Sequence, residues 1–239
     1  MNNSLEILEW DSSFFGYPVA KITASAITAG ELKLLIATAK QRELKLIYIF
    51  TNPSDVIAAD AAKACSAKLV DQKITFHRKI EALNIPETDT HIKEFESAIP
   101  SEQLINLSMQ SGLYSRYKID TNFKKREFER MYLAWIENSV NKKIADHTFV
   151  YEENGKELGF VTLKARNNHG QIGLIAVDEK SRGKAIGKKL ITAVVNCLAE
   201  KKIPELDVAT QVDNEDACNF YKKTGFSESK AENIYHIWL

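Results

Sequence analysis

The sequence predicts a mixed α/β (α+β) chain in which a smaller N-terminal block precedes a larger, strand-rich block. Three observations support this class. The 239 residues are 44% hydrophobic and 27% charged, close to the average of globular proteins. Short strand-like apolar runs alternate along the chain with segments of helical periodicity. A polar stretch with a proline near residue 85 divides the chain into residues 1–85 and 86–239.

The N-terminal block is expected to alternate strands and helices. Two of its segments place apolar residues at helical spacing, and three others are rich in β-branched and aromatic residues. We expect strands over 18–23, 44–51 and 73–80, and helices over 29–43 and 55–67, the second capped by Ser54.

The second block is expected to open with helices and continue as a run of strands. Asn154-Gly155 supplies the positive φ of a tight turn and therefore predicts a hairpin. The expected helices are 101–110, 124–140, 188–201 and 215–224, and the expected strands are 146–152, 157–164, 171–177, 205–210 and 234–239.

Charge and composition argue against several functional classes. Thirty-two Lys and Arg residues balance 32 Asp and Glu residues, so no net positive field favours nucleic acid. The first residues have neither the basic nor the apolar region of a secretion leader, so we expect none, and no apolar run reaches the length of a membrane span. Three scattered cysteines and five histidines without paired spacing predict neither a disulfide framework nor a metal site. We expect a cytoplasmic protein without nucleic-acid or membrane partners.

Residues 44–80 and 205–239 share the order strand, Asn-containing loop, helix, strand. One interpretation is a degenerate half-repeat whose first copy has lost the chemistry and keeps a structural or acceptor-binding role. The other is a chance similarity between two ordinary segments. The first copy has neither a preceding glycine-rich loop nor a tyrosine where Tyr221 falls in the second.

The most informative stretch is a strand that enters a loop and then a helix. The strand ends in Leu174, Ile175, Ala176 and Val177, and the loop and helix start comprise Ser181, Arg182, Gly183, Lys184, Ala185, Ile186, Gly187 and Lys188. Unpaired N–H groups at a helix start, small residues and three basic side chains predict a pyrophosphate cradle. It is neither a Walker loop nor GxGxxG. The alternative is a strand-to-helix turn with a solvated basic face.

A second motif follows downstream, where Asn214 and Tyr221 precede Gly225-Phe226 in an N-x-x-A-x-x-x-Y-x-x-x-G-F pattern. With the R-x-x-A-x-G loop at 182–187, residues 85–239 resemble the GNAT superfamily of acetyl-CoA-dependent N-acetyltransferases. The resemblance implies a central, mostly antiparallel, splayed sheet flanked by helices. Ala185 stands where the family usually has glycine.

The resemblance also implies roles for these residues. Acetyl-CoA would bind as co-substrate without a metal, its pantetheine along 174–177 and its pyrophosphate at 181–188. The N–H of Ile175 or Ala176 would hold the thioester carbonyl, and Asn214 would contact the CoA arm. Tyr221 would be the catalytic acid that protonates the CoA thiolate; the alternative is a packed core aromatic. No base is evident: Glu152 and Asp178 are candidates, and a neutral amine could attack directly.

Segments across nearly the full chain are similar to a narrower family, the dTDP-fucosamine acetyltransferases. They are Trp10–Gly16, Tyr114–Tyr117 with Asp120, Trp135–Ser139 and Ala209–Gln211. This similarity implies acetylation of the 4-amino group of dTDP-4-amino-4,6-dideoxygalactose for polysaccharide biosynthesis. Other amine acceptors, such as a protein N-terminus, a polyamine or an antibiotic, and a catalytically silent acyl-CoA-binding module are the alternatives.

For a sugar-nucleotide acceptor, Arg116 could bind the diphosphate, and Tyr114 and Tyr117 could stack on the base or sugar. The alternative for Arg116 is an ordinary ion pair. Three aromatic residues between Trp10 and Phe15 are expected to anchor the N-terminal block on the second block. A homodimer is one expectation for the C-terminal strand, whose edge could pair across subunits; an internal strand is the other.

Overall fold

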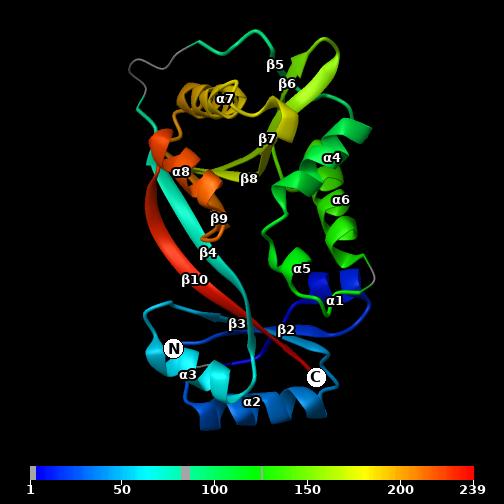
Figure 1. Cartoon of the computed structure of the whole chain (residues 1–239), viewed down its shortest axis with the longest axis vertical. Helices are drawn as coiled ribbons and strands as arrows, with labels where there is room; N and C mark the ends of the chain where they lie inside the picture. The colour runs from blue at the N-terminus through cyan, green and yellow to red at the C-terminus, as the bar shows by residue number, and fades with distance from the viewer. Residues whose placement is uncertain (1–3, 82–86, 125) are drawn as a thin grey trace.

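The computed structural model describes residues 4–81, 87–124 and 126–239 (Figure 1). Its strands form a ten-stranded sheet of order β1-β2-β3-β10-β4-β9-β8-β7-β6-β5. Neighbouring strands are antiparallel except for the pairs β2–β3 and β8–β9, which are parallel. The predicted mixed α/β class and mostly antiparallel sheet are therefore confirmed.

The N-terminal half follows the predicted alternation and adds a short first strand and helix. Its elements are β1 (Glu6–Ile7), α1 (Glu9–Phe15), β2 (Val19–Thr23), α2 (Ala29–Gln41), β3 (Leu46–Thr51), α3 (Val56–Ala64) and β4 (Lys68–Lys79). Asp55, not Ser54, caps α3, because the Asp55 carboxylate accepts a hydrogen bond from the N–H of Ala58 at 3.0 Å.

The second half contains the remaining elements. They are β5 (Ile92–Glu94), α4 (Glu102–Ser111), α5 (Arg116–Ile119), α6 (Glu127–Val140), β6 (His147–Glu153), β7 (Lys156–Arg166), β8 (His169–Val177), the 3₁₀ turn η1 (Glu179–Ser181), α7 (Ile186–Glu200), β9 (Glu205–Gln211), α8 (Glu215–Lys223) and β10 (Ser227–Trp238). Strands β4 and β10 begin earlier than predicted. The first five residues of β10 are exposed and lack an apolar pattern, so their pairing with β4 defines them.

Helices cover both faces of the sheet, and alternation along the strands assigns each face. Phe160 packs with the cluster beneath α1, α4, α5 and α6, whereas its neighbour Val161 packs with α7 and α8. In β3, Tyr48 likewise joins the first cluster, and Ile47 packs against α2 and α3. Figure 1 shows α2 and α3 covering the lower part of the sheet and α7 and α8 the upper part.

The aromatic anchor near the N-terminus is confirmed for two of its three residues. Phe15 is buried with Tyr117 and Phe123, and the guanidinium of Arg130 lies 4.9 Å from the ring centroid of Phe14. Trp10 is 49% exposed and only stacks on Phe14. The N-terminal block is thus attached to α5 and α6 chiefly through Phe15.

The two strand–helix–strand units occupy matching positions. Adding 159 to residue numbers in the first unit gives the second: Val56–Ala64 becomes Glu215–Lys223, and Lys68–Lys79 becomes Ser227–Trp238. No insertion or deletion separates them within these elements. Figure 1 shows β4 and β10 running side by side through the middle of the molecule.

The sheet register obeys the same relation. The pair Asn233↔Thr51 between β10 and β3 becomes Ile74↔Thr210 between β4 and β9, and the pair Trp238↔Leu46 becomes Lys79↔Glu205. Between β4 and β10, Glu232 pairs with its own symmetry counterpart, Lys73. A matched register across three strand pairs supports the degenerate-repeat interpretation over chance similarity.

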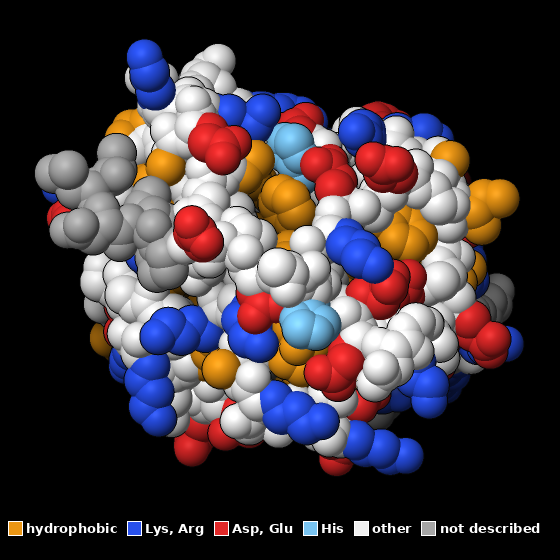
Figure 2. Space-filling model, turned by 90° about the horizontal axis from the view of Figure 1, so that it is seen from above, with side chains coloured by type: hydrophobic (Ala, Val, Ile, Leu, Met, Phe, Trp, Pro, Cys, Tyr) orange, Lys and Arg blue, Asp and Glu red, His pale blue; other side chains and the backbone are white. Residues whose placement is uncertain are grey.

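The two blocks share this sheet. Strand β4 lies between β9 and β10, and β10 lies between β3 and β4, so the C-terminal strand is internal and the alternative of pairing across subunits is wrong. The boundary predicted near residue 85 falls on residues 82–86, outside the described residues. The surface seen from above carries acidic and basic side chains interspersed, without an extended patch of one charge (Figure 2).

Candidate active site

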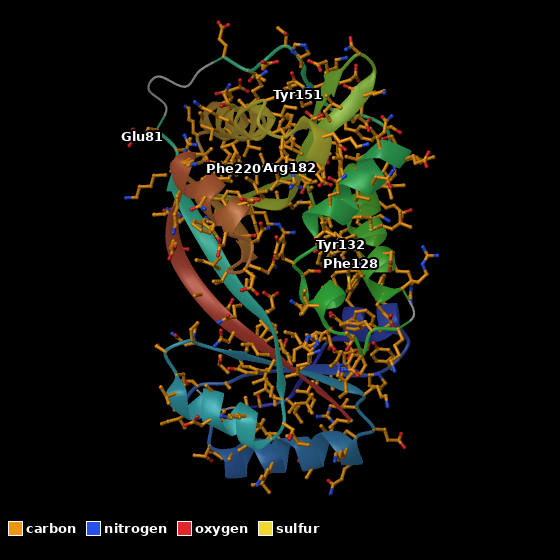
Figure 3. All side chains as sticks on the ribbon, viewed as in Figure 1. Glu81, Phe128, Tyr132, Tyr151, Arg182 and Phe220 are labelled. Carbon is orange, nitrogen blue, oxygen red and sulfur yellow. The ribbon has the colours of Figure 1, made fainter. Side chains whose placement is uncertain are left out.

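A cleft of about 1150 Å³ lies between the start of α7 and strand β4 of the N-terminal block. One end is lined by the loop after β8 and by α8, and the other by α5, α6 and β4. In Figure 3, Arg182 and Phe220 mark the first end, and Tyr132 on α6 lies toward the second. The cleft is thus long enough to bring two ligands together.

The cleft contains nearly all of the predicted cofactor residues. Those that line it are Leu174, Ile175, Ala176, Val177, Ser181, Arg182, Gly183, Ala185, Ile186, Gly187, Lys188, Asn214 and Tyr221. Lys184 is the exception, since it does not contribute to the lining. The three predicted acceptor residues, Tyr114, Arg116 and Tyr117, line the same cleft. Their roles toward ligands stay predictions.

Strand β8 separates from β9 inside the cleft. Its pairing with β9 runs from His169 to Ile172, whereas its pairing with β7 continues to Val177. A β-bulge starts the separation, because Gly173 and Leu174 together oppose the single residue Thr162. The last part of β8 therefore presents a free backbone edge to the cleft.

Alternation of the backbone shows which amides face this edge. The N–H of Leu174 donates to Thr162 Oγ1 at 2.8 Å, and the N–H of Asp178 donates to the carbonyl of Leu158 at 2.9 Å. Both bonds point toward β7. Successive strand N–H groups point to opposite sides, so those of Ile175 and Val177 face the gap. Of the two amides predicted to hold the thioester carbonyl, that of Ile175 therefore faces the gap and that of Ala176 does not.

The loop before α7 forms an anion cradle from its backbone. Asp178 caps the short turn η1 by accepting a hydrogen bond from the N–H of Lys180. Gly183 and Ala185 are both left-handed, with φ of 80° and 60°. Helix α7 begins after Ala185 without a side-chain cap among the described residues, so its first N–H groups remain available. This helix start, Gly187 and Lys188 line the cleft and favour a phosphate group.

Ala185 stands where the resemblance implies a glycine. It adopts a left-handed backbone conformation that glycine tolerates freely and that costs alanine about 1 kcal/mol. We expect Ala185→Gly to raise the free energy of unfolding by about 0.5 to 1 kcal/mol. Urea denaturation measures the change. Gly183→Ala is the matched control: no atom lies within 4 Å of the added Cβ, so only strain should act and stability should fall. Equal stability of all three proteins would contradict the argument.

Asn214 and Tyr221 are positioned by α8. The Asn214 side chain caps the helix through the N–H of Ala217 and donates to Thr210 Oγ1 at 3.3 Å. Tyr221 is 3% exposed, and its ring packs against Phe76 and Phe226. Burial raises the pKa of the Tyr221 phenol, so the hydroxyl stays protonated near neutral pH. The residue is both a core aromatic and a wall of the cleft.

The second end of the cleft is built around Arg116. Its guanidinium carbon lies 4.6 Å from the ring centroid of Tyr117 and 5.0 Å from that of Tyr48. Nη2 donates to the Tyr117 hydroxyl at 2.7 Å, and the buried Nε has no partner among the described residues. Tyr117 is 5% exposed, so its ring supports Arg116, whereas Tyr114 is 43% exposed and free to stack.

The sequence analysis gave no site role to the residues that β4 and α6 bring to this end, namely Asp71, Lys73, Tyr132 and Trp135. Asp71 is 7% exposed. The one signal in the sequence was an acidic residue, Asp71, that directly follows Val70 and precedes the strand expected over 73–80. The two carboxylates considered as bases lie elsewhere: Glu152 pairs with Lys93 at 2.7 Å, Asp178 caps η1, and neither lines the cleft.

The described residues contain neither a group of three or more His, Cys, Asp or Glu side chains able to hold a metal nor a helix long and apolar enough to cross a membrane. Cys218 is packed, since its thiol donates to the carbonyl of Gln211 at 3.5 Å and burial raises the thiol pKa. The lining of the cleft includes Arg116, acidic residues and tyrosines.

The model of the acetyltransferase (GNAT) family matches residues 111–226, which contain the splayed strand, the cradle and α8. Residues 111–226 are thus similar to the GNAT superfamily of acetyltransferases. This match supports the superfamily predicted from the loop and the Tyr221 motif. The first copy of the repeat has no counterpart of Leu174–Val177, since β2, aligned with β8 through their parallel pairings, ends at Thr23.

Two curated relatives match parts of the chain. The spore coat polysaccharide biosynthesis protein SpsD of Bacillus subtilis (strain 168) is 25% identical over 58% of this chain and 47% of its own length. The uncharacterized N-acetyltransferase MJ1207 of Methanocaldococcus jannaschii is 30% identical over 49% of this chain and 52% of its own. The chain thus spans about half the length of these relatives.

A solved structure is similar in fold to most of this chain. The tandem GNAT protein from the clavulanic acid biosynthesis pathway superposes with a TM-score of 0.57 at 15% identity, covering 93% of this chain and 76% of that one. Similarity at this identity shows the fold. Two consecutive GNAT units in that protein fit the complete and truncated copies seen here.

Proposed function

We propose that the protein transfers the acetyl group of acetyl-CoA to the amino group of a nucleotide-linked amino sugar, such as dTDP-4-amino-4,6-dideoxygalactose. One observation carries the proposal: a single cleft joins a GNAT anion cradle and a free strand edge to an arginine-bearing second end. The similarity to SpsD, a spore coat polysaccharide biosynthesis protein, supports a sugar acceptor.

The residues present fit the donor. The uncapped start of α7 and the left-handed residues Gly183 and Ala185 leave backbone amides free for a pyrophosphate. Nothing lies within 4 Å of a Cβ built at Gly183, so a ligand can approach closely there. The edge of β8 would pair with the pantetheine arm. Acetyl-CoA, when bound, supplies the acetyl thioester.

The chain's groups then act on the reacting atoms. The N–H of Ile175 would donate to the thioester oxygen as negative charge develops on it during attack by the amine nitrogen. Tyr221, protonated because of its burial, would give its proton to the departing sulfur. The amide forms as the carbon–sulfur bond breaks and the nitrogen loses a proton to water, and water returns a proton to Tyr221.

The acceptor end suits a diphosphate linked to a ring system. Arg116 always carries charge, and two tyrosine rings hold its guanidinium while Nε remains unpaired. A planar guanidinium binds phosphate oxygens in pairs. Lys73 lines the same end and adds positive charge. Tyr114, which is exposed, would stack on the base or sugar.

The test measures CoA release from acetyl-CoA with a thiol reagent. The acceptors are dTDP-4-amino-4,6-dideoxygalactose, its hydroxyl analogue, spermidine and a peptide with a free N-terminus. Release with the amino sugar nucleotide and no other acceptor supports the proposal. Release with spermidine or the peptide would overturn the acceptor class, and binding of acetyl-CoA without release on any acceptor would favour a silent module.

A further inference from the structure

Asp71 enters the cleft from the truncated N-terminal copy. It lies on β4 opposite Ile234 of β10, two residues before Lys73, which pairs with the last residue of β9. Residues two apart on a strand share a face, and both Asp71 and Lys73 line the cleft. The insertion of β4 between β9 and β10 therefore delivers a carboxylate to the acceptor end.

The carboxylate of Asp71 lacks a full set of partners. The residue is 7% exposed, and its buried Oδ1 has no hydrogen-bond partner among the described residues. Leaving a buried charged oxygen unpaired costs about 1–3 kcal/mol or more. The oxygen therefore marks a place for a donor from a ligand.

The charges around Asp71 come from several elements. Burial raises its pKa to about 6, while Arg116 of α5, Gln211 of β9 and Lys73 of β4 lower it and Asp213 of the following loop raises it. The charge of Asp71 also contributes to raising the pKa of Tyr132 on α6. The group is thus ionised at neutral pH but can accept a proton.

Other acids of the lining are less suited to this task. Glu179 and Asp216 line the cleft but are exposed and belong to the cradle end. The repeat counterpart of Asp71 is Lys230, which is exposed and paired with Glu232 at 2.7 Å. The buried acid is therefore a property of the first copy alone.

Resting on the proposed function, we propose that Asp71 binds the ammonium group of the acceptor and takes its proton as the nitrogen attacks the acetyl carbonyl. One N–H bond of the ammonium breaks, its proton goes to a carboxylate oxygen of Asp71, and its electron pair forms the new bond to the acetyl carbon. The nitrogen gives its second proton to water as the neutral amide forms. The carbon–sulfur pair leaves with sulfur, which Tyr221 protonates. The truncated copy, which lacks the donor site, thus supplies the base for the other copy.

The test compares pH profiles of kcat/KM for the wild type, Asp71→Asn and Asp71→Glu with the amino sugar nucleotide. With Asp71 as base, the wild-type value should stay level from about pH 6.5 to the pKa of the free amine. In Asp71→Asn the reaction needs neutral amine, so kcat/KM should fall about 10- to 100-fold at pH 7 and rise about tenfold per pH unit. Asp71→Glu should keep the level profile at reduced rate.

Asp207→Asn is the matched control, since Asp207 pairs with His77 outside the cleft. Its profile should follow that of the wild type. An Asp71→Asn pH profile that runs parallel to that of the wild type would overturn the proposal, whatever the absolute value of kcat/KM. If Asp71→Asn does not fold, a level Asp71→Glu profile supports the base and a tenfold rise per pH unit overturns it. If the wild type releases no CoA with the amino sugar nucleotide, the proposed function is wrong, and the role of Asp71 is still untouched. The pH profiles are then measured with whichever amine the protein acetylates.

Discussion

A Tyr221→Phe variant is expected to lose about 10²–10³-fold in kcat at pH 7, because the departing thiolate loses its proton donor. The Kd for CoA should change little, since the ring fills the same space against Phe76 and Phe226. Rapid-quench single-turnover kinetics report the chemical step, and isothermal titration reports CoA binding. The pKa of Tyr221 is raised by burial, so the wild-type rate should show no Tyr221 ionisation near neutral pH.

Tyr235→Phe is the control for the loss of a buried tyrosine hydroxyl. Tyr235 is 8% exposed on β10 and packs with the α2 and α3 cluster, away from the cleft. Its variant should keep the wild-type kcat. A Tyr221→Phe enzyme with an unchanged single-turnover rate would show that water or another group protonates sulfur, and the assignment of Tyr221 would fail.

The half of the cleft that we propose binds acetyl-CoA was predictable because its residues are close together in sequence. The loop at 181–188 and the helix at 215–223 lie at the ends of adjacent strands, so spacing alone brings Gly187 and Tyr221 to one cleft. Lys184 failed to reach the lining because the chain turns through Gly183 and Ala185 in left-handed conformation. Backbone turns of this kind redirect single side chains without leaving a clear periodic signal.

The acceptor half was only partly predictable because topology assembles it. Asp71 is about 140 residues from Gln211 in sequence, and only the exchange of β4 and β10 between the two copies brings them together. The early part of β10 was missed for the same reason: residues 227–231 are exposed and polar, and pairing with β4 rather than burial holds them in the strand.

An Asp120→Asn variant is expected to lower the free energy of unfolding by about 3–5 kcal/mol, since Asp120 is an ionised acid in the core. Its Oδ2 accepts hydrogen bonds from His236 Nδ1 at 2.6 Å and Trp238 Nε1 at 2.8 Å, and its Oδ1 accepts from the N–H of Asn122 at 3.1 Å. These bonds lower the pKa of Asp120 well below its usual range. Urea denaturation with an unchanged m-value measures the loss. A loss below 1 kcal/mol would contradict this role.

The same network predicts acid sensitivity with a defined sign. Burial lowers the pKa of His236 from 6.5 to about 4, so the folded protein keeps the ring neutral while the unfolded chain protonates it first. Its contribution is complete above pH 6.5 and is lost as pH falls toward 4, by up to about 3 kcal/mol. In His236→Gln, which keeps a donor for Asp120, this slope should disappear. In His147→Gln, at a half-buried histidine that pairs with Glu94 outside this network, it should remain.

Protonation of His236 at low pH should also affect the acceptor end of the cleft. The His236 ring stacks on Tyr48 with centroids 4.7 Å apart, and Tyr48 in turn supports the Arg116 guanidinium. Protonation of His236 would therefore loosen the residue proposed to hold the diphosphate before the donor cradle is affected. Isothermal titration at pH 4, where about half of the folded molecules carry a protonated His236, should show weakened sugar-nucleotide binding in the wild type but not in His236→Gln, with CoA affinity alike in both. Equal weakening of both ligands would instead indicate global unfolding.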